Sequence, residues 1–178
     1  LGAIRGYANT TVYRAIYLFK KTDVATYSNF TTFCPCVFDT DGITGDNNYI
    51  WSGKNTGAVW ESASNWVFYN SSETKYHLAA NEPASSTNVF IIKNDDCNIV
   101  TPTVSEDATC GNLTMLNGLN IDIAENHTLT INGTATFTNG VINGNVIFGS
   151  SATVSGASTS SHVDGIVTKS GAANGFTF

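Results

Sequence analysis

Short runs of alternating apolar and polar residues fill the chain between residues 109 and 169. Their apolar members often stand two apart, which is the period of a β-strand, because successive side chains point to opposite faces of the pleat. Asn-Gly pairs that begin at residues 117, 132, 139 and 143 separate the runs, and both residue types tolerate the positive φ of tight turns. No helical period is long enough to compete, so the pattern predicts an all-β fold.

Two all-β arrangements fit this pattern. Asn-Gly pairs suit two-residue hairpins, which would build an antiparallel sandwich. The turns are irregularly spaced, however, and a parallel β-helix stacks very short strands and turns its corners with Gly, Asn and Ser. Asn side chains can also form ladders between equivalent corners. We therefore predict a parallel β-solenoid over residues 88–178, with about four coils of about twenty residues each.

Three further segments precede the expected solenoid. Residues 1–37 carry strand-like runs rich in aromatic and β-branched residues, and they look like the tail of an immunoglobulin-like β-sandwich whose earlier strands are missing. We therefore expect the sequence to be a processed product or an internal piece of something larger. Residues 38–50 are acidic and turn-forming, which predicts a junction, and residues 51–87 are predicted to form a tryptophan-rich cap.

The three tryptophans, Trp51, Trp60 and Trp66, allow two interpretations. The end of a β-solenoid leaves its core uncovered, and repeat proteins need an atypical end unit to close it. Large aromatic rings suit this role because they bury much area per residue. Alternatively, the three rings form a platform on which a glycan stacks. Exposed, coplanar rings would favour the platform.

Composition and charge narrow the functional classes. Only 12% of residues are charged and the net charge is −6, which argues against nucleic-acid binding, because that binding needs clustered Lys and Arg. After Lys93 the only basic side chain is Lys169, and no apolar stretch approaches the roughly 18 residues of a membrane span. The abundance of Asn, Thr, Ser and Gly is typical of extracellular β-rich proteins, so we expect a location outside the cell and no direct insertion into a membrane.

The four cysteines are Cys34, Cys36, Cys97 and Cys110. A bridge between Cys97 and Cys110 would close a short loop and stabilise the fold by roughly 2–3 kcal/mol. Cys34 and Cys36 are too close in the sequence for a disulfide of relaxed geometry, and a strained disulfide between them is the alternative. Buried free thiols and a metal site are the alternatives, and an oxidising compartment favours the bridge.

An acidic loop at residues 39–48 is the candidate metal site. Asp39, Asp41 and Asp46 could bring carboxylate oxygens to one side of a turn-rich loop, as calcium requires. The stretch lacks the closing Glu of an EF-hand. Two interpretations of this loop therefore remain: it binds a calcium ion that stiffens the junction, or it is a solvated turn without metal.

Catalytic motifs are weak in this sequence. The C-terminal half offers only Lys169 as the basic residue that a polysaccharide lyase would need, and its carboxylates stand mostly beside turn residues. The nucleophile, phosphate-loop and dinucleotide motifs do not occur. We therefore expect a protein that is not an enzyme.

The arrangement of these motifs resembles a known surface module. WSG…W…NW is followed by NVFII, then by Pro102, Cys110-Gly-Asn-Leu-Thr and repeating LTING and VINGNVIF units. Residues 51–178 thereby resemble a module of large Bacteroidetes cell-surface proteins, in which a Trp-rich lead-in opens a parallel β-solenoid. Such proteins are often adhesins or gliding-motility proteins exported by the type IX secretion system. The resemblance implies a surface-displayed, multidomain, non-catalytic protein with that secretion machinery as a partner.

Together these observations predict a segment of a secreted adhesin that acts as a stiff spacer or display stalk. The alternative is a carbohydrate-binding module, or an appendage of a polysaccharide-degrading enzyme, with glycans as ligands.

Overall fold

The computed structural model describes residues 43–53, 58–73, 75–92, 100–116 and 118–171. Residues 1–37, predicted to be the tail of a sandwich, lie outside this part, as do residues 38–42 of the expected junction. Nearly everything described is strand, turn or loop, with one short 3-10 helix, η4 (Ala63–Asn65). No helix in the described ranges is long and apolar enough to cross a membrane.

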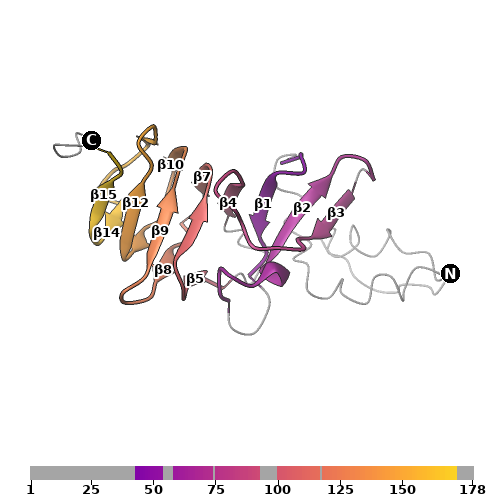
Figure 1. Cartoon of the computed structure of the whole chain (residues 1–178), viewed down its shortest axis with the longest axis horizontal. Helices are drawn as coiled ribbons and strands as arrows, with labels where there is room; N and C mark the ends of the chain where they lie inside the picture. The colour runs from indigo at the N-terminus through magenta and orange to yellow at the C-terminus, as the bar shows by residue number, and fades with distance from the viewer. Residues whose placement is uncertain (1–42, 54–57, 74, 93–99, 117, 172–178) are drawn as a thin grey trace, which may run out of the picture.

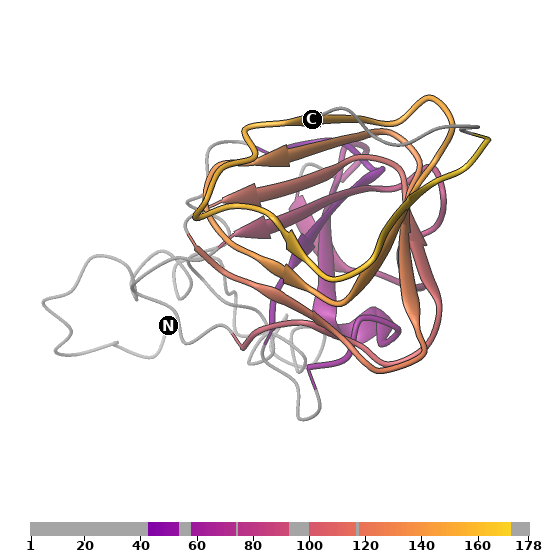
Figure 2. The same cartoon turned by 90° about the vertical axis from the view of Figure 1, so that its left-hand side faces the viewer.

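Three walls of parallel strands form a solenoid that is roughly triangular when viewed along its axis (Figure 2). Wall A contains β4 (Asn88–Ile92), β7 (Leu113–Leu116), β10 (Thr134–Phe137) and β13 (Thr153–Ser155). Wall B contains β5 (Thr103–Val104), β8 (Ile121–Ile123), β11 (Ile142–Asn143) and β14 (Val163–Asp164). Wall C contains β6 (Ala108–Cys110), β9 (Thr128–Ile131), β12 (Asn145–Phe148) and β15 (Val167–Lys169). The predicted parallel β-solenoid is confirmed.

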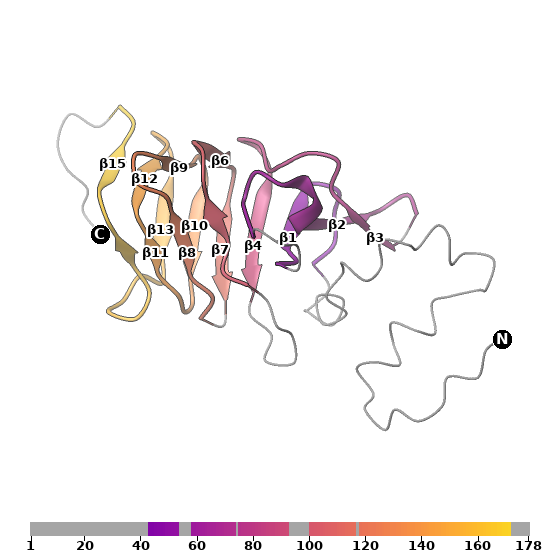
Figure 3. The same ribbon diagram turned by 90° about the horizontal axis from the view of Figure 1, so that it is seen from below.

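The coils follow one another along the long axis of the molecule (Figure 3), and their lengths differ. On wall A, Val89 lies beside Leu113, Leu113 beside Ala135, and Ala135 beside Val154. The number of residues between paired positions on wall A therefore decreases toward the C-terminal end, whereas on walls B and C it does not. Loops outside the strands absorb these differences, so that the inward positions still stack on one another.

The N-terminal end departs from the parallel pattern. β1 (Asn48–Trp51) continues wall A in parallel with β4, and it spans the boundary expected at residue 50. β2 (Trp66–Asn70) and β3 (Lys75–Leu78) then extend the same sheet in antiparallel pairing (Figure 1). The segment predicted as a cap is thus a partial coil followed by a hairpin.

The apolar core runs through the interior of the coils. Alternate residues of each strand point inward, and the largest fully buried side chains belong to all three walls and to the partial first coil. They are Trp51, Trp60, Trp66, Phe148, Ile50, Ile91, Leu113, Met115, Ile121, Leu129, Ile131 and Ile142. A smaller cluster around Ile50, Val67 and Ile92 covers the outer face of the sheet near β1. Burial of this apolar surface is the main stabilising contribution to the fold.

Tight corners between walls require glycine at specific places. Gly144 joins β11 to β12 with φ +127°, a conformation that other residues rarely adopt. A Cβ atom at this position would lie 2.6 Å from the Cβ of Ile123 in the coil below. The Asn-Gly pairs of the sequence therefore serve as coil corners rather than as hairpin turns.

Candidate functional surfaces

The three tryptophans form one buried cluster at the N-terminal end of the core. Trp66 contacts Trp51 and Trp60 edge to face, with ring centroids 4.9 and 4.8 Å apart, and no ring is more than 1% exposed. The indole N–H of Trp66 donates to the Trp60 carbonyl at 2.7 Å, and that of Trp51 donates to the Val100 carbonyl at 2.8 Å. The glycan-platform interpretation is wrong, because buried rings in tilted contact offer no face to a sugar.

An amide ladder runs along one edge of wall A. Asn88 donates its side-chain amide to Asn48 at 2.8 Å, and Asn112 donates to Asn88 at 2.9 Å. The Oδ1 of Asn112 accepts the backbone N–H of Thr134 at 2.7 Å, and the hydroxyls of Thr134 and Thr153 lie 3.0 Å apart. This column links every coil of wall A with side-chain hydrogen bonds. The predicted Asn ladder is confirmed.

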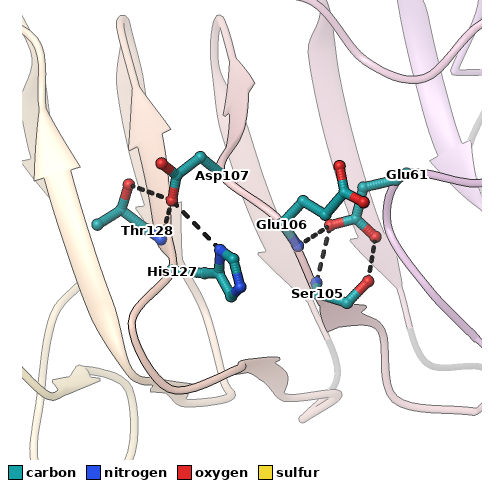
Figure 4. Close-up of polar contacts among 6 residues, drawn as sticks. All are labelled: Glu61, Ser105, Glu106, Asp107, His127 and Thr128. Carbon is teal, nitrogen blue, oxygen red and sulfur yellow. Dashed lines mark hydrogen bonds and ion pairs between the residues drawn. The ribbon is translucent and has the colours of Figure 1, made fainter.

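A carboxylate from the partial first coil binds the corner between walls B and C (Figure 4). Glu61 accepts the backbone N–H groups of Ser105 and Glu106 at 2.8 and 2.9 Å, and its other oxygen accepts the Ser105 hydroxyl at 2.9 Å. Hydrogen bonds to an ionised acceptor are stronger than neutral ones. Glu61 therefore fastens the cap to the first complete coil.

The next corner along the axis repeats this device. Asp107 accepts the backbone N–H of Thr128 at 2.9 Å and its hydroxyl at 3.3 Å, while the Nδ1 of His127 lies 3.6 Å away (Figure 4). Both carboxylates are occupied by backbone groups of the following coil, an arrangement that holds neighbouring coils in register.

A further acidic residue makes a similar contact between coils. Asp122 on wall B accepts the side-chain amide of Asn143 at 2.6 Å. The sequence could not indicate these pairs, because their partners lie on different coils. Glu61 in particular is far from Ser105 along the chain, and only the winding of the solenoid brings them together.

The predicted calcium residues are only partly described. Asp39 and Asp41 lie outside the described residues. Asp46 is exposed and accepts the backbone N–H of Ser71 at 2.7 Å, in the turn between β2 and β3. Among the residues that the structure describes, no three His, Cys, Asp or Glu side chains are grouped so that they could hold a metal ion. Calcium binding by the acidic loop stays a prediction.

The cysteine that the structure describes is a core residue. Cys110 ends β6 with its side chain inward, is 0% exposed, and carries a free thiol. This observation departs from the predicted bridge to Cys97, because the strand register directs Cys110 into the apolar interior beside Ile131. Cys97, Cys34 and Cys36 lie outside the described residues. Burial raises the pKa of the Cys110 thiol to about 12.

Cys110 should therefore be inert toward alkylating reagents in the folded protein. Thiolate is the reactive form, and both the raised pKa and the burial keep it scarce at pH 8. We expect iodoacetamide to modify Cys110 only after the protein is unfolded in urea, as measured by peptide mass spectrometry. Because burial raises the pKa above the ordinary thiol value of 9.0, the resistance should persist above that pH for as long as the protein stays folded. A Cys97–Cys110 peptide pair in a non-reducing digest would contradict the structure.

In the part of the chain that the structure describes, a cavity lies at the opposite end of the core. The cavity has a volume of about 330 Å³ and lies against the last described coils. It is lined by Phe137, Phe148, Val154, Ala157, Ser158, His162 and Val163. This cavity could not be predicted from the sequence, because its lining residues follow the same alternating pattern as the rest of the solenoid.

The fold defines this chain as a parallel β-solenoid protein with a closed N-terminal end. Comparison of the chain with family models, curated proteins and solved structures found no match.

Proposed function

We propose that this chain is a segment of a secreted cell-surface adhesin, in which it acts as a rigid spacer that displays other parts of the protein. The resemblance to Bacteroidetes surface proteins supports an extracellular location and export by a type IX system. The low content of charged side chains and the polar, hydroxyl-rich surface support the same setting.

One observation carries the proposal: neighbouring coils are bonded to each other on every wall. Backbone hydrogen bonds join the strands of walls A, B and C from coil to coil. Side-chain contacts add to them at the corners, through the Asn ladder and through Glu61 and Asp107. A bend between coils would break several of these bonds together, so the body should behave as one stiff unit.

The residues proposed to bind a glycan in the carbohydrate-binding alternative are not accessible at the surface. Trp51, Trp60 and Trp66 are in the core and cannot stack on a sugar. A glycan array tests what remains of this alternative. We expect no selective binding by this segment alone. Tight and selective binding of one glycan class would contradict the spacer proposal.

Stiffness can be measured directly between the two ends. Spin labels at Ser72, in the β2–β3 turn, and at Thr168, on β15, occupy exposed positions near opposite ends of the solenoid. We expect a single narrow distance distribution from pulsed dipolar spectroscopy. The double variant Asn88→Ala/Asn112→Ala should broaden it, because this variant removes three hydrogen bonds of the column.

A matched control is Asn120→Ala, which removes one side-chain bond to Val141 from a different corner. This variant should broaden the distribution less than the ladder double variant does. A broad distribution in the unmodified chain would rule out a stiff spacer, whatever the variants do.

A further inference from the structure

The Asn-Gly pairs at the corners of the solenoid can undergo a reaction of their own. The backbone nitrogen of the glycine can attack the side-chain carbonyl carbon of the asparagine before it, since a residue without a Cβ atom hinders this approach least. The product is a five-membered succinimide, and asparagine is one of the chemically labile residues of proteins. Three such pairs lie wholly within the described part of the chain and begin at residues 132, 139 and 143. Their surroundings determine which of them can react.

Hydrogen bonds hold both reacting groups of the pair at Asn132. Its side-chain amide donates to the Thr109 hydroxyl and to the Cys110 carbonyl, each at 3.0 Å. The N–H of Gly133 donates to the Gly111 carbonyl at 2.9 Å. The succinimide forms only after these bonds are broken, because the side chain must rotate and the nitrogen must leave its acceptor.

The pair at Asn143 is held in the same way. Its side-chain amide donates to the Asp122 carboxylate at 2.6 Å, and a bond to an ionised acceptor is stronger than a neutral one. The N–H of Gly144 donates to the Asp164 carbonyl at 2.8 Å. Like Asn132, Asn143 is half-buried. Its surroundings therefore oppose cyclisation as well.

Asn139 differs from both. It is exposed at the corner between walls A and B. Within the described residues, neither its side-chain amide nor the N–H of Gly140 makes a hydrogen bond. The Nδ2 atom lies over Gly118, where a Cβ atom would be 3.3 Å away, so this neighbour has no side chain that could hold the amide. Gly140 is buried, but the ring closes between adjacent residues and the attacked carbon belongs to the exposed side chain.

We propose that Asn139 is the site at which the folded chain deamidates spontaneously. The Gly140 nitrogen loses its proton and bonds to the Cγ of Asn139, while the Cγ–Nδ2 bond breaks and Nδ2 leaves with that proton as ammonia. The succinimide then takes up one water. Hydrolysis between Cγ and the Gly140 nitrogen gives aspartate, and hydrolysis between the backbone carbonyl carbon and that nitrogen gives isoaspartate. This assignment depends on the fold and not on the proposed role as a spacer.

Isoaspartate changes the corner itself. It adds a carboxylate, and it adds one methylene carbon to the backbone between β10 and β11. Directly after Gly140, Val141 donates its N–H to the Asn120 side chain at 2.9 Å and accepts the N–H of Ile121 at 3.0 Å. The longer backbone displaces these groups. A neutral corner thus becomes a charged and weaker one as the protein ages.

Peptide mass spectrometry of the full chain during incubation at neutral pH tests the assignment. In the folded chain, Asn139 should deamidate at least about ten times faster than Asn132 or Asn143, because those pairs must first break their hydrogen bonds. In urea the three rates should become similar. Equal rates in the folded chain would overturn the proposal. A rate difference that persists in urea would also overturn it, since the difference would then come from the neighbouring sequence and not from the fold.

Asp122→Ala tests the cause of the protection. Asp122 is exposed, and the variant removes the acceptor of the Asn143 amide. Deamidation of Asn143 should become about three times faster or more, while the rate at Asn139 stays the same. An unchanged rate at Asn143 would contradict protection by hydrogen bonding.

The effect on the corner is measured by thermal unfolding. The isoaspartate form, separated by chromatography, should have a lower Tm than Asn139→Asp, which carries the same charge on a backbone of normal length. Equal Tm values would show that the longer backbone does not weaken the corner.

Discussion

Trp66→Ala should lower the free energy of unfolding by about 4 kcal/mol, in the range measured for the loss of large buried aromatic side chains. Trp66 is fully buried, contacts Trp51 and Trp60 edge to face, and donates a hydrogen bond to the Trp60 carbonyl. The variant would lose all of these contacts and leave a large cavity where the cap meets the solenoid. Urea denaturation followed by circular dichroism measures the effect.

An exposed apolar residue provides the control for this experiment. Ile166 lies at the corner before β15 and is 68% exposed. Ile166→Ala should change the free energy of unfolding by less than about 0.5 kcal/mol. Trp66→Phe should keep part of the ring contacts and fall between the two. Equal effects of Trp66→Ala and Ile166→Ala would show that the tryptophans do not close the core.

Leu129→Asp should prevent stable folding at pH 7, with a loss of about 4 kcal/mol or more. Leu129 is 0% exposed in the middle of wall C, between Ala108 and Val146 of the neighbouring coils. A carboxylate there has no cation to pair with among these neighbours, and burial would raise its pKa above the unfolded value of about 3.9. As the pH falls toward that value, the introduced carboxyl group becomes protonated in the folded and the unfolded state alike. The loss of unfolding free energy relative to the parent chain should therefore be smaller at pH 4 than at pH 7. Unfolding curves at the two pH values measure this difference.

The adjacent residue is a matched control. Thr130 follows Leu129 on β9 and points to the outer face beside Thr109 and Ile147. Thr130→Asp should lower the free energy of unfolding by less than about 1 kcal/mol, and this loss should depend little on pH. If the two variants are equally damaging, the assignment of inward and outward faces on wall C is wrong.

The sequence was sufficient to predict the solenoid because its inward positions keep the period of a strand. Leu129 and Ile131 alternate with threonines. Three of the Asn-Gly glycines, Gly118, Gly140 and Gly144, have the positive φ that a tight corner needs. The Asn ladder was also predictable, since Asn88 and Asn112 stand at equivalent places in successive coils. These are local signals, and a parallel stack repeats them from coil to coil.

Contacts that depend on the winding could not be read from the sequence. Glu61 meets Ser105 only because the chain begins a coil before the hairpin, and nothing near Glu61 in the sequence indicates its partner. The antiparallel pairing of β2 with β1 was not predicted, although it explains how the tryptophans are covered. The expected bridge of Cys110 relied on spacing alone, whereas the strand register determines where its side chain points.

Nuclear Overhauser contacts between β9 and β12 would test the central claim most directly. In the parallel arrangement, Thr128 meets Asn145 at one end of the strand pair and Ile131 meets Phe148 at the other. A stacked solenoid predicts cross-strand contacts that follow this same-direction register. Contacts in the opposite order, with Thr128 beside Phe148 and Ile131 beside Asn145, would mean an antiparallel hairpin and would contradict the solenoid.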